Sequence, residues 1–410
     1  MGRSRYEVLI TNAAGTTILT DPIGHADPVT NTPGHSRIEL KPRHNEAGFG
    51  ELQVSAVPWI LSAVQTPDAR LVVRRTDEPS GQVAVEFSGP IEAPENAYNI
   101  ETDGTDGYGT VKVKCTDDRV WCGYRLVYPN PAQAATAQTS AKYAIAAVNP
   151  ETAMYALANL NLGPGALAAR RLTGLTMAAG ASLLPGVTVS ASFTRDTILS
   201  DALREVSRLA GGAGLGYRIV QTSSGMQFQV FKPQDLTASV VFSRPMGNIR
   251  ELTYAASAPT ATVAVVGDAT AGIGRVIKER INTGAHSSGW ARREVFVDAR
   301  GAANAGELDQ AGDEALKEQG PQTRFSARVI ETPQLRYGFD YPLGAQVSVQ
   351  PYGGGPFVSA LVLGADITVT PDRGEVVEPI VGTDNDLLAD AKAAEIRKLW
   401  RTIGRLQGAL

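Results

Sequence analysis

The sequence predicts a mainly β (α+β) fold with two barrel-like β domains, a small α/β module inserted between them and a C-terminal helix. Segments that alternate apolar and polar residues recur about every ten residues over 6–128 and again over 249–370, as in sandwiches and barrels. Glycine (42) and proline (24) are frequent enough to supply many tight turns. The 410 residues exceed one ordinary core, because domains usually hold about 100–200 residues.

This pattern divides the chain into four expected parts. The strand-like alternation first stops at Pro129-Asn130-Pro131 and returns near Ile249. The expected parts are an N-terminal β-barrel-like domain (1–128), a helical and α/β insertion module (129–247), a second β-barrel-like domain (248–378) and a C-terminal helix (379–410).

In the N-terminal domain, the clearest alternation is Gly-Thr-Val-Lys-Val-Lys at 109–114, which is typical of a half-buried strand. The turn Asn-Ala-Ala-Gly at 12–15 predicts a hairpin between the first two strands. The expected strands are 6–11, 16–19, 37–40, 51–54, 70–74, 83–87 and 109–114.

The only two cysteines, Cys115 and Cys122, flank residues 116–119, which are predicted to form a hairpin turn. Two cysteines do not make a disulfide framework. Two reduced cysteines in neighbouring strands are the favoured interpretation, because disulfides are rare in cytosolic proteins. A cross-strand disulfide is the alternative.

The insertion module is expected to combine helices with a hairpin. Its strongest helix is 196–210, where apolar residues recur at helical spacing, with Thr194 as the N-cap and Gly211 after the last turn. The Ala/Gln/Thr-rich segment 132–147 is expected to be a helix or a mobile insertion. The other expected elements are a helix at 151–160, a strand at 187–193 and a hairpin with strands 217–221 and 226–231.

The second β domain repeats the alternating pattern around one expected helix, 303–319. The Gly-rich loop 267–274 follows an expected strand, but Ile273 stands where a phosphate-binding loop needs lysine. A hairpin is therefore predicted there. The expected strands are 261–266, 275–281, 290–297, 324–331, 346–349, 357–363 and 366–369.

The chain ends in a predicted helix, 384–406. Four of its apolar residues follow a 3-4-3 spacing typical of a coiled-coil seam, with a tryptophan beside them. A helix this short is marginal alone, so it is expected to contact its own domain, a neighbouring copy or a partner protein. The predicted contact residues are Ile396, Leu399, Trp400, Ile403 and Leu406.

Charge and hydropathy exclude several classes of protein. The net charge of −4 provides no basic face for displacing counterions from phosphate, so no direct nucleic-acid recognition is expected. No apolar run approaches the roughly 20 residues that cross a bilayer, and the N-terminus lacks a signal-peptide core. The protein is expected to fold in the cytoplasm without membrane insertion.

No arrangement of residues points to catalysis, a cofactor or a metal, and no enzyme is predicted. The four histidines lack zinc-binding spacing, and a weak site formed by Asp21, His25 and His35 is disfavoured as a chance cluster. A Gly-x-Ser-x-Gly nucleophile elbow is absent from the sequence. Loosely grouped acids, expected to be solvated turn residues, are Glu92, Glu95, Glu101, Asp103 and Asp106.

Two segments of the second β domain resemble the siphovirus Gp37-like family of tail proteins. One is 248–267, NIRELTYAASAPTATVAVVG, which a Gly-rich loop and Arg275 follow. The other is 335–349, LRYGFDYPLGAQVSV, which is similar to a Tyr-Gly-x-Asp-Tyr-x-Leu-Gly-Asp-x-Val motif before a barrel strand. Ala345 replaces the usual aspartate. The similar region covers about three quarters of the chain, and its motifs are structural, so no catalytic residues are transferred.

The resemblance implies a structural role, because this family is similar to the baseplate-hub proteins of tailed phages. It implies a homotrimeric ring at the virion tail tip, assembled in the host cytoplasm. The ring would adapt the six-fold tail tube to a three-fold spike or fibre and close the tube until DNA ejection. Its implied partners are the distal tail protein ring, the tape-measure protein and the downstream spike or fibre protein.

Two other functions are weighed against the hub. A tail-associated cell-envelope hydrolase needs a catalytic group, and the sequence offers none. A carbohydrate-binding receptor module would place exposed aromatic residues along a groove. The four tryptophans are scattered and are mostly expected in the core: Trp59, Trp121, Trp290 and Trp400.

Overall fold

The structure is a computed structural model, in which the chain divides into two compact units. Unit 1 comprises Met1–Glu251 with Ala327–Gly382, and unit 2 comprises Leu252–Ser326 with Thr383–Leu410. The predicted C-terminal helix, 384–406, lies outside the described residues. The structure describes residues 4–12, 14–18, 23, 35–77, 80–97, 109–211, 214–222, 225–270, 272–300, 302, 305–320, 322–350, 355–370 and 374–382.

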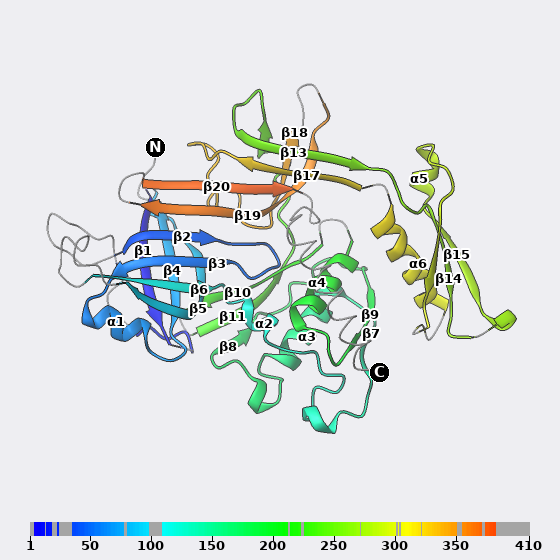
Figure 1. The fold of residues 1–410 in the computed structure, drawn as a ribbon, viewed down its shortest axis with the longest axis horizontal. Helices are drawn as coiled ribbons and strands as arrows, with labels where there is room; N and C mark the ends of the chain where they lie inside the picture. Colours follow the sequence, from blue (N-terminus) through cyan, green and yellow to red (C-terminus); the bar gives the residue numbers. More distant parts are fainter. Residues whose placement is uncertain are drawn as a thin grey trace. The chain divides into compact units, whose positions relative to one another are not determined.

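Unit 1 is built on a hydrogen-bonded sheet of twelve strands (Figure 1), whose far ends β13 and β17 continue into unit 2. Its path runs β1-β4-β5-β6-β3-β2-β19-β20-β17-β13, with β18 and β12 joined beside β19. The described sheets are open rather than closed, and the mainly β prediction is confirmed. The strands are β1 (Ser4–Thr11), β2 (His35–Lys41), β3 (Phe49–Ser55), β4 (Arg70–Asp77), β5 (Val83–Ala97), β6 (Thr110–Thr116), β12 (Val241–Ser243), β13 (Ile249–Ser257), β17 (Gln322–Val329), β18 (Gln346–Gln350), β19 (Val358–Thr370) and β20 (Gly374–Gly382).

Strands from both predicted β domains share this sheet, because β2 pairs with β19. In that antiparallel pair, Ile38 lies opposite Val369 and Leu40 lies opposite Ile367. The break expected between 357–363 and 366–369 is instead an irregularity at Gly364 inside the single long strand β19. The unexpected strand β20 pairs along most of β19.

The long strand β5 changes partners along its length. Its first part pairs with β4, and its last part, from Ile91 onward, pairs with β6. Gly89 lies just before this change, and a Cβ atom there would meet the Thr116 carbonyl oxygen at 1.8 Å. Because that contact is with backbone, only glycine fits at the crossing.

The alternation seen in the sequence corresponds to one buried face of the sheet. Along β1, β2 and β3 every second side chain is buried, as the two-residue period of a strand requires. Fully buried members of this face are Val8, Ile10, Ile38, Leu40 and Leu52.

Two short helices in this region were not expected. Helix α1 (Pro58–Val64) begins with proline at its first turn and buries Ile60, and helix α2 (Val120–Gly123) follows β6. The predicted hairpin turn at 116–119 is therefore wrong. Cys115 lies in β6 and Cys122 in α2, and both are buried free thiols. A turn does form, closed by the Val120 amide donating to the Asp117 carbonyl at 2.8 Å, but α2 follows it instead of a second strand. The side chains of Asp117 and Asp118 form buried ion pairs.

The module between the β regions has two helices packed on each other over small sheets. Helices α3 and α4 form a shared apolar core with the hairpin β10–β11. Asn149 caps α3 by accepting a hydrogen bond from the Glu151 amide at 3.0 Å. The elements are η1 (Ala135–Ala137), β7 (Lys142–Val148), α3 (Pro150–Asn161), η2 (Ala168–Arg170), β8 (Leu175–Met177), β9 (Val189–Thr194), α4 (Leu199–Leu209), β10 (Gly216–Thr222) and β11 (Gly225–Phe231).

The structure corrects two predictions in this module. Residues 132–147 do not form a long helix; they hold one 3₁₀ turn and then most of β7, which pairs with β9. Helix α4 begins at Leu199 rather than 196, with Ile198 at the N-cap and no side-chain cap. Thr194 ends β9, and its hydroxyl bonds to Asp196 instead.

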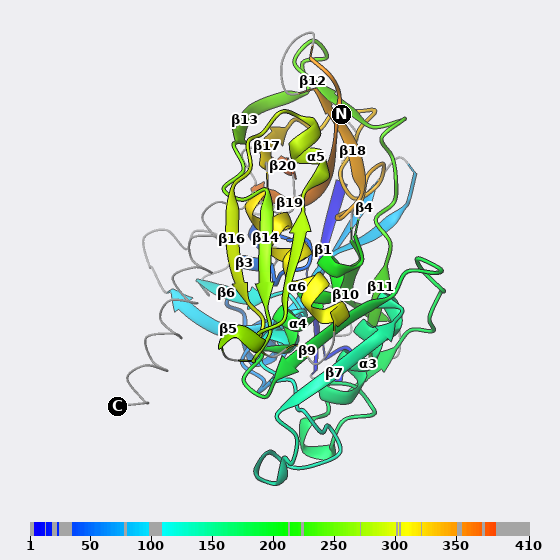
Figure 2. The same cartoon turned by 90° about the vertical axis from the view of Figure 1, so that its right-hand side faces the viewer.

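Unit 2 is a small three-stranded sheet with one helix along a face. Strand β14 (Val263–Gly267) lies between β15 (Ile277–Ile281), which is antiparallel, and β16 (Glu294–Asp298), which is parallel. Helix α6 (Ala305–Gln319) lies along a face of that sheet (Figure 2) and packs Leu308 and Leu316 against it. A short helix α5 (Thr283–Ser287) and a 3₁₀ turn η3 (Gly272–Gly274) complete the unit. The predicted hairpin at 267–274 is confirmed.

The crossing at Gly89 gives a stability prediction. Gly89→Ala is expected to lower the free energy of unfolding by about 1–3 kcal/mol, because the methyl group collides with backbone that cannot move aside. Urea denaturation followed by circular dichroism measures the change. Gly123→Ala is the matched control, since a Cβ atom there meets nothing within 4 Å. Equal stabilities of the two variants would contradict the crowding seen at Gly89.

Candidate functional site

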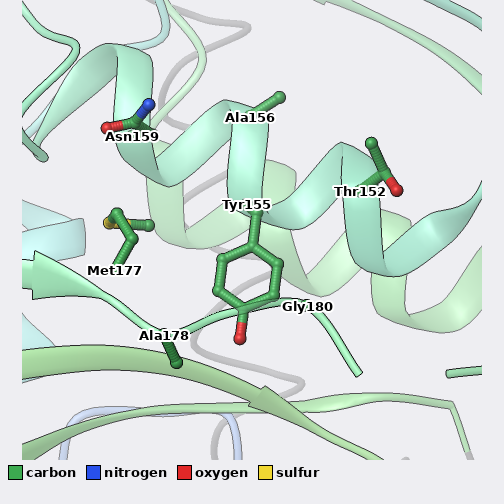
Figure 3. A pocket seen from close by; sticks show the side chains of 7 residues that line it. All are labelled: Thr152, Tyr155, Ala156, Asn159, Met177, Ala178 and Gly180. Carbon is green, nitrogen blue, oxygen red and sulfur yellow. The ribbon is translucent and has the colours of Figure 1, made fainter. Parts of the chain in front are cut away.

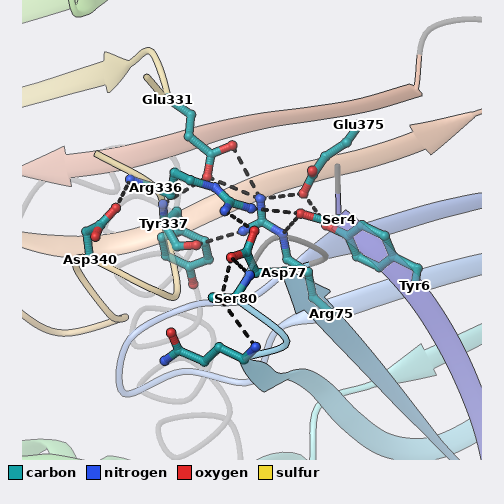
Figure 4. A network of polar contacts seen from close by, with 11 residues as sticks. Ser4, Tyr6, Arg75, Asp77, Ser80, Glu331, Arg336, Tyr337, Asp340 and Glu375 are labelled. Carbon is teal, nitrogen blue, oxygen red and sulfur yellow. Dashed lines mark hydrogen bonds and ion pairs between the residues drawn. The ribbon is translucent and has the colours of Figure 1, made fainter. Parts of the chain in front are cut away.

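Unit 1 contains a dense network of charged side chains around the buried guanidinium of Arg75 (Figure 4). Its members come from the two ends of the chain: β1 and β4 at one end, and the segment before β18 together with β20 at the other. We call it the Arg75 network; it comprises Ser4, Tyr6, Arg75, Asp77, Ser80, Glu331, Arg336, Tyr337, Asp340 and Glu375.

Arg75 is fully buried, and each of its guanidinium nitrogens has a partner. Its Nη2 lies 3.2 Å from a Glu331 carboxylate oxygen and 2.5 Å from Glu375. Its Nη1 donates to the Tyr337 carbonyl at 2.7 Å, and its Nε donates to the Ser4 hydroxyl at 3.1 Å. A buried cation is tolerated only when it is paired and hydrogen-bonded in this way.

A second arginine, Arg336, extends the network toward the turn that ends β4. It forms an ion pair with Asp77, and its Nη2 donates to the Ser4 hydroxyl at 3.0 Å. Both arginines lie over the ring of Phe339, with Cζ-to-centroid distances of 4.9 Å for Arg75 and 4.7 Å for Arg336.

Asp77, Glu331 and Glu375 of this network are paired with arginines, and Asp340 accepts from the Arg336 backbone amide at 2.6 Å. Burial raises the pKa of Glu331, against the opposing effect of Arg75. A hydrogen bond from Ser80 and the ion pair with Arg336 hold the pKa of Asp77 below its usual range. Tyr6 donates to Glu375 at 2.6 Å. The arrangement therefore acts as a structural tie, with the two half-buried carboxylates Glu331 and Glu375 bound to the buried Arg75.

A second buried ion pair joins the N-terminal strands to the inserted module. Arg70 and Asp118 are both fully buried, and the Arg70 Nε donates to Asp118 at 3.1 Å. Ser88 donates to the same carboxylate at 2.6 Å, and burial raises the pKa of Asp118. The Arg70 Nη1 donates to the Gln221 side chain of β10 at 2.7 Å, which anchors the hairpin β10–β11.

Asn45, in the turn between β2 and β3, makes a further link to the module. It has a left-handed backbone (φ 53°), which asparagine tolerates better than most residues. Its side chain accepts a hydrogen bond from the Tyr217 amide at 3.0 Å and donates to the Leu215 carbonyl at 3.1 Å. The Tyr217 hydroxyl returns a bond to the Asn45 carbonyl at 3.1 Å.

An open pocket of about 350 Å³ lies beside α3 in the module (Figure 3). Its only titratable side chain is Tyr155, whose hydroxyl accepts a hydrogen bond from the Val230 amide at 3.2 Å. Without a charged or nucleophilic group, this pocket offers no catalytic chemistry. Its lining residues are Thr152, Tyr155, Ala156, Asn159, Met177, Ala178 and Gly180.

The residues considered for a metal site do not come together in the part of the chain that the structure describes. His35 and His44 are buried in unit 1, and His286 lies in α5 of unit 2. No group of three His, Cys, Asp or Glu side chains among the described residues could hold a metal ion. Asp21 and His25 lie outside the described residues.

The other predicted residues have mixed outcomes. Among the loosely grouped acids, Glu92 accepts a hydrogen bond from Tyr124 at 2.9 Å. The expectation that the tryptophans are mostly in the core is wrong for Trp59 and Trp290, which are 48% and 37% exposed. Of the described helices, none is both long and apolar enough to span a membrane. The positions that lie outside the described residues or side chains are Glu95, Glu101, Asp103, Asp106, Ile396, Leu399, Trp400, Ile403 and Leu406.

Sequence reasoning missed the Arg75 and Arg70 networks. Arg70 begins the predicted strand 70–74 and Arg75 follows it directly, and an arginine at a buried position of such a strand is the one signal for a buried ion pair. The sequence did not reveal which distant acids, such as Glu331 or Glu375, complete it.

Removal of the central cation is expected to destabilise unit 1 strongly. Arg75→Ala removes a fully buried cation, leaves two half-buried carboxylates without their partner and should cost about 3–5 kcal/mol of unfolding free energy. Arg5→Ala is the control, because its ion pair with Glu7 is exposed and should contribute no more than about 1 kcal/mol. Chemical denaturation of both variants tests this; a loss at Arg75 as small as that at Arg5 would contradict the structural tie.

His44 is expected to make stability fall on mild acidification. Both ring nitrogens are buried without a hydrogen-bond partner among the described residues, and burial, helped by Arg119, lowers the pKa of His44 to about 3. The unfolded chain takes up this proton below about pH 6.5, so stability is full above that pH and declines toward pH 3.

His44 alone should lower the free energy of unfolding by about 2 kcal/mol when the pH falls from 7 to 5. Denaturation at the two pH values measures the loss, which His44→Gln should abolish. The exposed His286→Gln serves as control and should keep the full loss. An unchanged pH dependence in His44→Gln would show that another group is responsible.

Comparison with known proteins places the chain in a family. The model of the family described as "Siphovirus ReqiPepy6 Gp37-like protein" matches residues 24–383. No curated protein matched the chain. The fold is similar to the 43 kDa tail protein of prophage MuSo2 from Shewanella oneidensis, with a TM-score of 0.52 at 10% identity over 92% of this chain and 98% of that one. It is also similar to a tail protein from Neisseria meningitidis MC58, with a TM-score of 0.50 at 10% identity over 93% and 97%. The chain thus has the fold of phage tail proteins and belongs to the Siphovirus ReqiPepy6 Gp37-like family.

Proposed function

We propose that this protein is the structural hub of a phage-type tail tip, located in the virion tail and assembled in the host cytoplasm. In this proposal three copies form a ring that adapts the six-fold tail tube to a three-fold spike or fibre. The ring closes the tube until DNA ejection. The observation that carries the proposal is the family membership together with a fold similarity that spans 98% of a tail protein.

The β architecture supports ring formation. The main sheet is an open path whose terminal strands are β1 and β13, and part of the outer edge of β1 already pairs with Ile18 and Ile23. Open sheet edges readily add strands from another chain. When one edge of a subunit contacts a different edge of the next subunit, the subunits form a closed ring if repeated rotation returns to the first subunit. We propose 1–128 and 248–378 as two hub domains in each chain, so that three chains present six blocks to the tube, with 129–247 as the inserted module.

The proposed partners are other tail proteins. They are the distal tail protein ring, the tape-measure protein and the downstream spike or fibre protein, with no direct nucleic-acid recognition and no membrane insertion. A non-enzymatic role is part of the proposal. The buried Asp118 and the half-buried Glu331 and Glu375 support it, because each is paired with an arginine rather than held free for proton transfer.

Native mass spectrometry of the purified protein tests the hub proposal. The expected species has three times the 43.2 kDa mass of one chain, and it should bind the distal tail protein ring. A monomer at micromolar concentration, together with release of sugars or peptides from cell walls, would favour an envelope hydrolase instead and would overturn the hub.

We further propose that residues 379–410 contact neighbouring copies or the next tail-tip protein. The family match ends at residue 383, so this segment lies almost entirely beyond it. The proposed contact residues are Ile396, Leu399, Trp400, Ile403 and Leu406.

Substitution within this segment should weaken assembly. Leu399→Asp is expected to raise the dissociation constant of the trimer, or of its complex with the next tip protein, by at least about tenfold, because it places a charge in an apolar contact. Gln407→Asp introduces the same charge at a polar position and should leave assembly unchanged. Sedimentation velocity measures both variants; equal behaviour would remove the segment from the interface.

A further inference from the structure

A second cavity of unit 1, with a volume of about 280 Å³, lies where three parts of the unit meet. The β4–β6 region contributes Phe87, Asp117 and Arg119 to its lining. The hairpin β10–β11 contributes Arg218 and Phe231, and the turn before β18 contributes Leu343. Its volume is just below the range of about 300–1,000 Å³ typical of small-molecule sites, so it suits a small group rather than a large cofactor.

The positive and negative charges of the residues that line this cavity do not cancel. They are two arginines and one aspartate, which leaves one positive charge. The Arg119 Nε donates a hydrogen bond to the Asp117 carboxylate at 2.8 Å, and the Arg119 Nη2 forms an ion pair with the same carboxylate. The Arg119 Nη1 makes no hydrogen bond to any described residue.

Arg218 supplies the uncompensated charge. Its Nε donates to the Gln229 side-chain oxygen at 3.0 Å, and its guanidinium lies 5.1 Å from the ring centroid of Phe231. No carboxylate among the described residues pairs with it. Burial, followed by repulsion from Arg119, lowers the pKa of Arg218, as expected for two cations that face one cavity. An added anion would relieve both effects.

The remaining walls are apolar. Phe87 is buried beneath the cavity, and Phe231 and Leu343 lie around it. We propose that this cavity binds a monocarboxylate carried on an apolar or aromatic stem, with the carboxylate held by Arg119 and Arg218. One net positive charge matches a monoanion better than a phosphate dianion, and guanidinium groups hold carboxylates in paired hydrogen bonds. The proposal does not depend on the hub function.

The same chemistry has two sources, a free small carboxylate and the terminal carboxylate of a polypeptide. The first probe is 3-phenylpropanoate, compared with 3-phenylpropanamide, which has the same shape without the charge. The second probe is N-acetyl-Leu-Phe, compared with its C-terminal amide. Isothermal titration calorimetry and ligand-observed NMR measure binding to the full chain. Tighter binding of the peptide acid identifies a polypeptide as the source, and tighter binding of 3-phenylpropanoate identifies a small molecule.

Variants locate the binding at this cavity. Arg218→Gln is expected to weaken binding of the acid at least about tenfold, because it removes a charge-assisted contact. Arg195→Gln, at an exposed arginine of the same module, should bind as the unchanged protein does. Thermal unfolding checks that both variants are folded, which is why the half-exposed mouth residue is altered rather than the buried Arg119.

Three results would overturn the proposal. They are binding of the amides as strong as binding of the acids, no effect of Arg218→Gln, and no binding of either acid up to 10-fold above the roughly 1 mM dissociation constant of a weak site.

Discussion

A charged group inside a protein must find its partners there, and this requirement organises unit 1. Arg75 and Arg70 are both buried in the same strand, β4, where an unpaired guanidinium would be strongly unfavourable. Arg75 is neutralised by Glu331 and Glu375, and Arg70 by Asp118. Glu331 and Glu375 bring the C-terminal part of unit 1 to the N-terminal sheet, and Gln221, which accepts from Arg70, brings the hairpin of the inserted module. Satisfying the two cations therefore requires the complete tertiary arrangement.

Backbone pairing and side-chain pairing support each other in this arrangement. The β2–β19 ladder joins the N-terminal strands of unit 1 to its C-terminal strands, and the Arg75 network joins the same two regions through side chains. The inserted module is held by Gln221, which accepts from Arg70, and by Asn45, which exchanges hydrogen bonds with Tyr217. Such multiple attachment suits a proposed tail component, since buried pairs resist rearrangement once all partners are in place.

The cavity with Arg119 and Arg218 arises from the same geometry. It forms because the N-terminal sheet, the hairpin β10–β11 and the turn before β18 meet without filling the space between them. Each of these segments was expected from the sequence, but their meeting was not. No local sequence feature identifies either arginine as a cavity residue, because each matters only together with the other, which lies 99 positions away in the sequence.

The sequence by itself determined most strands, the helices α3 and α6, the hairpin β10–β11 and the family. These follow from local rules, because side-chain direction alternates along a strand and glycine supplies the turns between strands. The sequence did not predict helix α2, strand β20 or the late start of α4, because tertiary contacts outweigh weak local preferences at these places. Only the tertiary structure decided that both β regions share one sheet and which acids neutralise Arg70 and Arg75. Pairing over more than 250 positions depends on the whole packed chain, and no short window of sequence contains it.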